Sequence, residues 1–135
     1  MQTEATSSKL PCPCGSAKLF SDCCLIFLQG DRTPDTAEQL MRSRYSAYAT
    51  FNLDYVKNTW HPDTLPADLR LVPGQVWIGL KIKRTEAGGI TDTSGIVAFE
   101  AKSKRGGRAR KMKEVSRFEK IDSRWYYVSG DYSAN

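Results

Sequence analysis

The sequence is poor in several residue types and motifs on which common functions depend. Its 135 residues include one histidine, His61, and four cysteines. No cysteine lies beyond position 24. It has no Gly-rich phosphate loop, no G-x-S-x-G nucleophile turn and no H-E-x-x-H zinc helix. The usual nucleotide-binding, α/β-hydrolase and metalloprotease chemistries are therefore not expected, and an enzymatic function is disfavoured.

Long apolar stretches are also missing. No run approaches the roughly 18 apolar residues that a membrane-spanning helix needs. The first ten residues contain no apolar segment of the signal-peptide type. With 40% hydrophobic residues and a net charge of +5, the chain suits one globular domain with a small appendage. We therefore expect a cytoplasmic protein without a membrane span, with residues 1–10 as a flexible tail.

The four cysteines, in contrast, all fall within thirteen residues. A C-x-C pair, eight intervening residues and a C-C pair can converge on one point, with Gly15 and Ser16 supplying a tight turn. Four thiolates around one ion form the closed tetrahedral site that is typical of structural zinc, and such a site is also compatible with iron. The predicted metal ligands are Cys12, Cys14, Cys23 and Cys24.

Two other chemistries for these thiols are disfavoured. Disulfides require an oxidising compartment, and the adjacent pair Cys23-Cys24 restricts the Cβ directions that a disulfide needs. A redox thiol pair usually has the spacing C-x-x-C at the start of a helix, which this sequence lacks.

The cluster resembles a known motif. The run Pro11-Cys12-Pro13-Cys14-Gly15-Ser16, followed by Cys23-Cys24, is similar to the SEC-C motif, the zinc-binding knuckle at the C-terminus of the translocase motor SecA. Further segments carry the resemblance: LMRSRYSAY (40–48), TWHP (59–62), SRF (116–118) and RWYYVSGD (124–131). Together they resemble the YchJ-like bacterial proteins, in which a SEC-C motif precedes a domain of the nuclear-transport-factor-2-like (NTF2-like) fold.

The resemblance implies a fold and a kind of partner, but no activity, because the family is largely uncharacterised. In SecA the similar module contacts the export chaperone SecB and acidic surfaces. This implies a protein partner such as a SecB-like chaperone, the translocation machinery or the ribosome. Several residues depart from the family pattern, among them 19–22, where relatives have a Lys-rich stretch. Ala17 stands where a glycine is usual, and Lys113 precedes Glu114 where relatives often have a histidine.

Helices are expected in the first half of the domain. Thr36 and Gln39 form a capping box, and apolar residues recur at helical spacing beyond it, so we predict a helix over about 36–50. Asn52 can cap a second, shorter helix that must end before His61-Pro62. The apolar run at 25–28 is expected to pack the knuckle on the domain.

Strands are expected in the second half. Ile78, Leu80 and Ile82 alternate with polar or small residues, and residues 96–104 alternate likewise with Val97 and Phe99 on one face. Turn signals at 88–89, 106–107 and 122–123 separate four strands, which predicts an antiparallel meander. The third strand alternates poorly, and we predict a bulge in it. The fold class is therefore α+β: a knuckle (11–30), then helices on a curved four-stranded antiparallel sheet (31–135).

Helices packed on one side of a curved sheet form a cone, and a cone of this kind often encloses a pocket lined with aromatic residues. The candidates are Tyr45, Tyr48, Trp60, Trp77, Phe99, Phe118, Trp125 and Tyr127. Core packing is the favoured interpretation for most of them. His61 is the candidate general base of a lyase- or isomerase-like site, with Asp54 or Asp63 assisting, although a lone histidine at a helix end is more often a packing or capping residue. Arg44 is expected to anchor a carboxylate or a carbonyl; binding an anionic ligand is the alternative.

Basic residues gather around the predicted turn at 106–107. They are Lys102, Lys104, Arg105, Arg108, Arg110, Lys111 and Lys113. A positive hairpin of this kind can bind RNA or an acidic protein, or it can serve only to keep a sheet edge soluble. The hypothesis favoured by the sequence as a whole is a metal-binding adaptor protein. Ligand binding in the cone and RNA binding by the hairpin are the alternatives, and a dimer is compatible with the fold.

Overall fold

The computed structural model describes residues 9–134, and the side chains of residues 9–131. The flexible tail predicted for residues 1–10 falls mostly outside the described residues. The helical elements are η1 (Phe20–Asp22, a 3₁₀ turn), α1 (Cys24–Leu28), α2 (Ala37–Ala49) and α3 (Leu53–Asn58). The strands are β1 (Val76–Ala87), β2 (Ser94–Arg105), β3 (Arg108–Ile121) and β4 (Arg124–Ala134). No helix in this part of the chain has the length and apolarity to cross a membrane.

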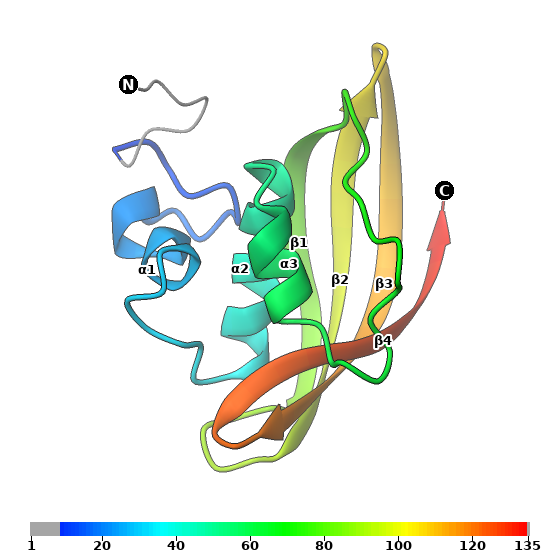
Figure 1. Cartoon of the computed structure of the whole chain (residues 1–135). Helices are drawn as coiled ribbons and strands as arrows, with labels where there is room; N and C mark the ends of the chain where they lie inside the picture. The colour runs from blue at the N-terminus through cyan, green and yellow to red at the C-terminus, as the bar shows by residue number, and fades with distance from the viewer. Residues whose placement is uncertain (1–8, 135) are drawn as a thin grey trace.

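The four strands form one antiparallel sheet in the order β1-β2-β3-β4, which confirms the predicted meander and the α+β class. Figure 1 shows α2 between the N-terminal segment and the sheet, with β4 curving across the lower end of the helices. A short parallel bridge joins Trp60 to Tyr127, so the segment after α3 pairs with β4. The helices, this segment and the curved sheet together enclose the interior of a cone.

Local hydrogen bonds explain where the two main helices begin. The Thr36 hydroxyl accepts from the backbone N–H of Gln39 at 3.1 Å, while the Gln39 side chain accepts from the N–H of Asp35 at 2.7 Å. The capping box is thus present, with its return bond one residue further upstream than the motif usually places it. Asn52 caps α3 by accepting from the N–H of Tyr55 at 3.0 Å.

The faces of β1 differ from the prediction. A register shift leaves Ile78 without a partner between Trp77 and Gly79. Trp77 therefore packs against the core, whereas Ile78 is 48% exposed. The expectation that Ile78 shares an inward face with Leu80 and Ile82 was wrong, because a bulge reverses the side-chain alternation that a regular strand would keep.

The bulge predicted in the third strand lies elsewhere. β2 and β3 pair without a register shift, and the shift between β3 and β4 places the extra residue, Val128, in β4. β3 alternates regularly, but two of its inward positions hold Glu114 and Ser116, both of them buried. Polar residues at inward positions, rather than a bulge, break the hydrophobic pattern of β3.

Candidate functional site

The loop that carries the first two cysteines is closed by backbone hydrogen bonds. The N–H of Cys12 donates to the carbonyl of Lys18 at 2.8 Å, and the N–H of Gly15 donates to the carbonyl of Cys12 at 3.2 Å. Gly15 has φ +81°, and a Cβ there would press on the Leu80 carbonyl of β1. Glycine at this position therefore allows both the turn and the close approach of the loop to the sheet.

The second pair of cysteines enters the site from the turn η1. The N–H of Cys23 donates to the carbonyl of Phe20 at 3.1 Å, and α1 begins at Cys24. The four Sγ atoms lie within 4.8 Å of one another, and those of Cys14 and Cys23 are 3.7 Å apart. Three of the four cysteines are buried, and Cys23 is half-buried. The structure thus brings together the four thiols that the sequence singled out.

Side chains from α2 surround the thiol cluster. Arg42 donates from Nη1 to the Cys14 carbonyl at 2.9 Å, and the same nitrogen lies 3.7 Å from Cys14 Sγ. Its Nε donates to Glu38 at 3.0 Å, which fixes the guanidinium in place. Ser46 lies 3.6 Å from Cys12 Sγ. Hydrogen bonds to the residues that bind a metal orient these ligands and moderate their charge, and Arg42 and Ser46 are placed to do so.

The thiols do not share one ionisation behaviour. Hydrogen bonds with Cys12 and Cys24, and then with Ser16 and Arg42, hold the pKa of Cys14 well below its ordinary value. Hydrogen bonds with Cys12 and Cys14, together with burial, raise the pKa of Cys24, and burial raises the pKa of Cys23. Burial therefore opposes the thiolate forms of Cys23 and Cys24, and a cation among the sulfur atoms would offset that cost.

The donor set fits a tetrahedral metal ion. Metal–sulfur bonds of about 2.3 Å place neighbouring sulfur atoms about 3.8 Å apart in a tetrahedron. The distance between Cys14 and Cys23 already matches this value, and the 4.8 Å limit on the remaining distances requires a contraction of about 1 Å at most. With four protein ligands, such a site leaves no coordination position for a substrate.

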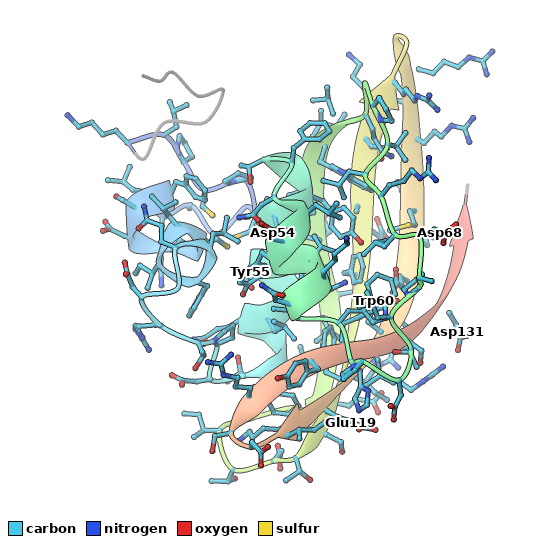
Figure 2. The ribbon with its side chains drawn as sticks, viewed as in Figure 1. Asp54, Tyr55, Trp60, Asp68, Glu119 and Asp131 are labelled. Carbon is cyan, nitrogen blue, oxygen red and sulfur yellow. The ribbon has the colours of Figure 1, made fainter. Side chains whose placement is uncertain are left out.

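A second candidate site is a cavity of about 260 Å³ inside the cone. Six of the eight predicted aromatic residues line it: Tyr45, Tyr48, Trp60, Trp77, Phe99 and Tyr127. Figure 2 shows Trp60 on the segment after α3. The ring centroids of Trp60 and Tyr127 are 4.8 Å apart in an edge-to-face arrangement. Phe118 and Trp125 are instead core residues, and the Trp125 indole donates to the Asp35 carbonyl at 3.1 Å.

Buried charges of both signs border this cavity. Arg44 donates from Nη1 to the Val56 carbonyl at 2.9 Å and to the Thr59 hydroxyl at 2.8 Å. Its guanidinium also lies over the rings of Trp60 and Tyr127, at 5.1 and 4.6 Å. The expectation that Arg44 anchors a carbonyl thus describes its contacts, and the carbonyl is that of Val56 in α3.

Glu114 and Ser116 are the polar cavity residues that the sequence did not predict. Oε2 of Glu114 accepts from the Ser116 hydroxyl at 2.6 Å and from the Tyr127 hydroxyl at 2.9 Å. Gly130 makes room for this carboxylate, since a Cβ at that position would overlap it. The available signal was the interrupted alternation of β3, which reflected a polar inward face.

His61 lies apart from the cavity lining. Its Nδ1 accepts from the N–H of Asp63 at 3.0 Å, and its Nε2 is 3.8 Å from a Glu119 carboxylate oxygen. Asp54 lies on α3 and is not a partner of His61 among the described residues (Figure 2). The structure therefore does not bring the candidate base together with the aromatic pocket.

The basic residues lie along the β2–β3 hairpin, and Figure 2 shows nitrogen-tipped side chains extending from its end. Lys102, Lys104, Arg105, Arg108, Arg110 and Lys113 are exposed, whereas Lys111 is half-buried, 3.9 Å from Glu100. The hairpin thus presents a positive surface. RNA binding through it stays a prediction.

The fold and the thiol cluster define a class: an NTF2-like α+β domain that carries a SEC-C motif. The family model for the YchJ middle NTF2-like domain matches residues 36–130, and the SEC-C model matches residues 10–25. The chain belongs to the UPF0225 family of YchJ-like proteins.

Individual relatives cover nearly the whole chain. A UPF0225 protein of Chromobacterium violaceum is 51% identical over 127 residues, spanning 91% of this chain and 93% of that protein. One from Deinococcus radiodurans is 44% identical, spanning 87% and 86%. The solution structure of a SEC-C motif containing protein from Rhodopseudomonas palustris superposes with a TM-score of 0.80 at 32% identity, covering 90% of this chain and 98% of that one. A crystal structure of a SEC-C motif containing protein from Psychrobacter arcticus gives 0.73 at 26% identity, covering 90% and 82%.

Proposed function

We propose that this protein is a cytoplasmic adaptor whose knuckle is held by one structural zinc ion, with iron as the alternative metal. The observation that carries the proposal is the convergence of four thiols within 4.8 Å. A reducing cytoplasm keeps such thiols available to a metal. Because four cysteines would occupy all positions of a tetrahedral ion, the metal would serve the fold rather than catalysis.

The first experiment is elemental analysis of the protein isolated from its native host, with Cys23→Ser protein beside it. One zinc or iron ion per chain is expected in the wild type, and a large loss in the variant. The analysis also decides between the two metals, which four thiolates alone do not. A metal-free wild type with four reactive thiols would overturn the proposal.

An apolar groove between the knuckle and the cone supports the adaptor role. The groove has a volume of about 790 Å³ and is bordered by Phe20, Leu25 and Leu28 on one side and by Phe51 and Val76 on the other. Phe51 and Val76 are 53% and 57% exposed. Exposed apolar residues around a groove often mark a protein-binding surface. The charged residue that lines the groove is Asp54, so the expected occupant is the apolar surface of a protein partner rather than an acidic one.

By resemblance to the knuckle of SecA, the partners to test are a SecB-type export chaperone and the ribosome. Binding of the metal-loaded protein to purified SecB, and its co-sedimentation with ribosomes, would be measured for the wild type, Phe51→Ser and Ile90→Ser. Ile90 is 68% exposed but lies outside the groove, so its variant is a matched control. We expect at least tenfold weaker binding for Phe51→Ser only. Absence of binding to both partners, or equal binding by Phe51→Ser, would contradict the adaptor role.

A further inference from the structure

We propose that the cavity inside the cone binds a small, uncharged, planar molecule that offers both a hydrogen-bond donor and an acceptor, such as an aromatic amide. This inference is independent of the metal and of the groove beside the knuckle. Three properties of the cavity support it: a rim of half-buried side chains, one buried cation together with one buried anion, and polar atoms without a hydrogen-bond partner.

The cavity has a buried floor and a partly exposed rim. Tyr45, Phe99 and Ala101 on the floor are almost fully buried, whereas Tyr48, Trp77 and Met112 are half-buried. A sealed packing defect would have buried residues on every side. The graded burial therefore indicates a pocket that a small molecule can enter between half-exposed side chains.

The charges of the pocket favour an uncharged ligand. Arg44 is 4% exposed and Glu114 is 9% exposed, so one cation and one anion are buried at the same cavity. No ion pair joins them among the described residues, but together they leave the site close to neutral. A charged ligand would add an uncompensated charge in a buried place, which is costly.

Both charged groups keep unused hydrogen-bonding atoms. The two hydrogen bonds of the Arg44 side chain come from Nη1, and both hydroxyl donors at Glu114 bind Oε2. Among the described residues, no hydrogen bond is found from Nε or Nη2 of Arg44 or to Oε1 of Glu114. The buried side-chain polar atom there that lacks any partner is Nε1 of Trp60. The guanidinium can therefore donate to an acceptor on the ligand, while the carboxylate accepts from a ligand N–H or O–H.

The pocket walls favour a flat ligand of limited size. Trp77 meets Tyr45 and Tyr48 edge to face at 5.9 and 6.4 Å, so aromatic surfaces border the space. The indole N–H of Trp60 is buried without an acceptor among the described residues and adds an unsatisfied donor to the wall. A volume of about 260 Å³ corresponds to on the order of ten non-hydrogen atoms, since liquid water occupies about 30 Å³ per molecule.

Three probes of one shape test the proposal: benzamide, which is neutral and has both a donor and an acceptor, benzoate, which is an anion, and benzamidinium, which is a cation. Each would be titrated into the full-length metal-loaded protein, labelled with ¹⁵N. We expect benzamide to bind at least tenfold more tightly than either ion. Its chemical-shift changes should centre on the Trp60 and Trp77 indoles and on Nε of Arg44.

Variants connect that binding to the named residues. Ala101→Leu fills the pocket from its floor and should abolish benzamide binding. Met112→Trp closes the half-exposed rim and replaces Ala101→Leu as the test if that variant fails to fold. Glu114→Gln removes the anion, so the uncompensated Arg44 should shift the preference towards benzoate. Glu119→Gln changes an exposed carboxylate outside the pocket on the same strand and should bind like the wild type.

The proposal is overturned if benzamide does not bind, if benzoate or benzamidinium binds as tightly as benzamide, or if folded Ala101→Leu or Met112→Trp protein keeps wild-type affinity. Loss of metal binding by the knuckle in a separate cysteine variant would not affect these outcomes. Failure of the adaptor role and failure of the pocket are therefore distinguishable.

Discussion

The thiol cluster and the cone cavity lie on two sides of α2 and bury polar groups in opposite ways. Arg42 reaches the sulfur atoms, while Arg44, two residues later, reaches the cavity. The cluster brings together four cysteine thiols. Their thiolate forms repel one another unless a cation lies between them. The cavity combines a cation with an anion and hydroxyl donors, so its charges balance without an added ion. This contrast indicates that the first site depends on an added ion and the second on the completeness of the fold.

Loss of the metal is expected to have the largest effect. Cys14→Ser removes a ligand that is completely buried, so the ion should be lost and the cluster left unsupported. Structural zinc contributes about 10–16 kcal/mol of binding free energy in small zinc peptides. We therefore expect the free energy of unfolding to fall by several kcal/mol, as measured by thermal melting. Wild-type protein treated with a chelator should behave like the variant, and equal melting of variant and metal-loaded wild type would contradict this dependence.

Replacing the two arginines of α2 separately would sharpen the comparison. Arg44→Met removes the buried cation that balances Glu114 and leaves the Val56 carbonyl without this donor, so a cost of about 1–3 kcal/mol is expected. Arg42→Met removes contacts at a partly exposed site and should cost about 1 kcal/mol. Denaturant unfolding measures both values. Adding Glu114→Gln to Arg44→Met should restore part of the loss, and equal costs for the two arginines would remove the distinction.

Alkaline pH should destabilise the cone. Burial raises the pKa of Tyr45 and of Tyr55 to about 12, whereas the same tyrosines in the unfolded chain titrate near pH 10. The unfolded state therefore loses these protons first, and the stability from the neutral phenols, complete below pH 10, declines as the pH rises towards 12. Unfolding midpoints measured from pH 9 to 12 should fall across this window, and fall less in Tyr45→Phe protein. A flat profile would contradict the prediction.

The smallest expected effect is a gain in stability at the knuckle. Ala17 has φ +72°, in the left-handed region that disfavours a side chain. Ala17→Gly should relieve strain of about 1 kcal/mol, partly offset by the greater freedom of glycine in the unfolded chain. The melting temperature should rise slightly while the metal content stays the same. An equal rise in Ala67→Gly protein, changed at an exposed residue without positive φ, would argue against a local cause.

The sequence predicted best where a residue type alone defines the chemistry. Cysteine spacing led to the thiol cluster, and the Thr36 cap and the glycine turns led to the correct element order. It predicted least where the sheet bends. The bulge at Ile78 exchanged the faces of β1, and none of the three register shifts of the sheet had a distinct local pattern in the sequence.

The polar lining of the cavity could not be predicted from the sequence for a related reason. Hydrophobic alternation detects strands that bury apolar residues, so inward positions occupied by Glu114 and Ser116 resembled an irregular strand. Partners such as Arg44 and Tyr127 come from distant segments, and only the folded cone places them beside these positions. His61 is the single imidazole of the chain, yet the carboxylates nearest to it, those of Asp63 and Glu119, do not line the cavity.

The placement of the two sites along the chain also sets the order in which synthesis can complete them. The cysteines and the side chains that contact them, Arg42 and Ser46, all lie within the first 46 residues. The cavity requires Tyr127 from β4, which leaves the ribosome after β1, β2 and β3. Because N-terminal parts of a chain are available for folding first, the knuckle can acquire its ion while the sheet is still being made. A nascent chain halted before β4 would then already contain its metal but no binding pocket.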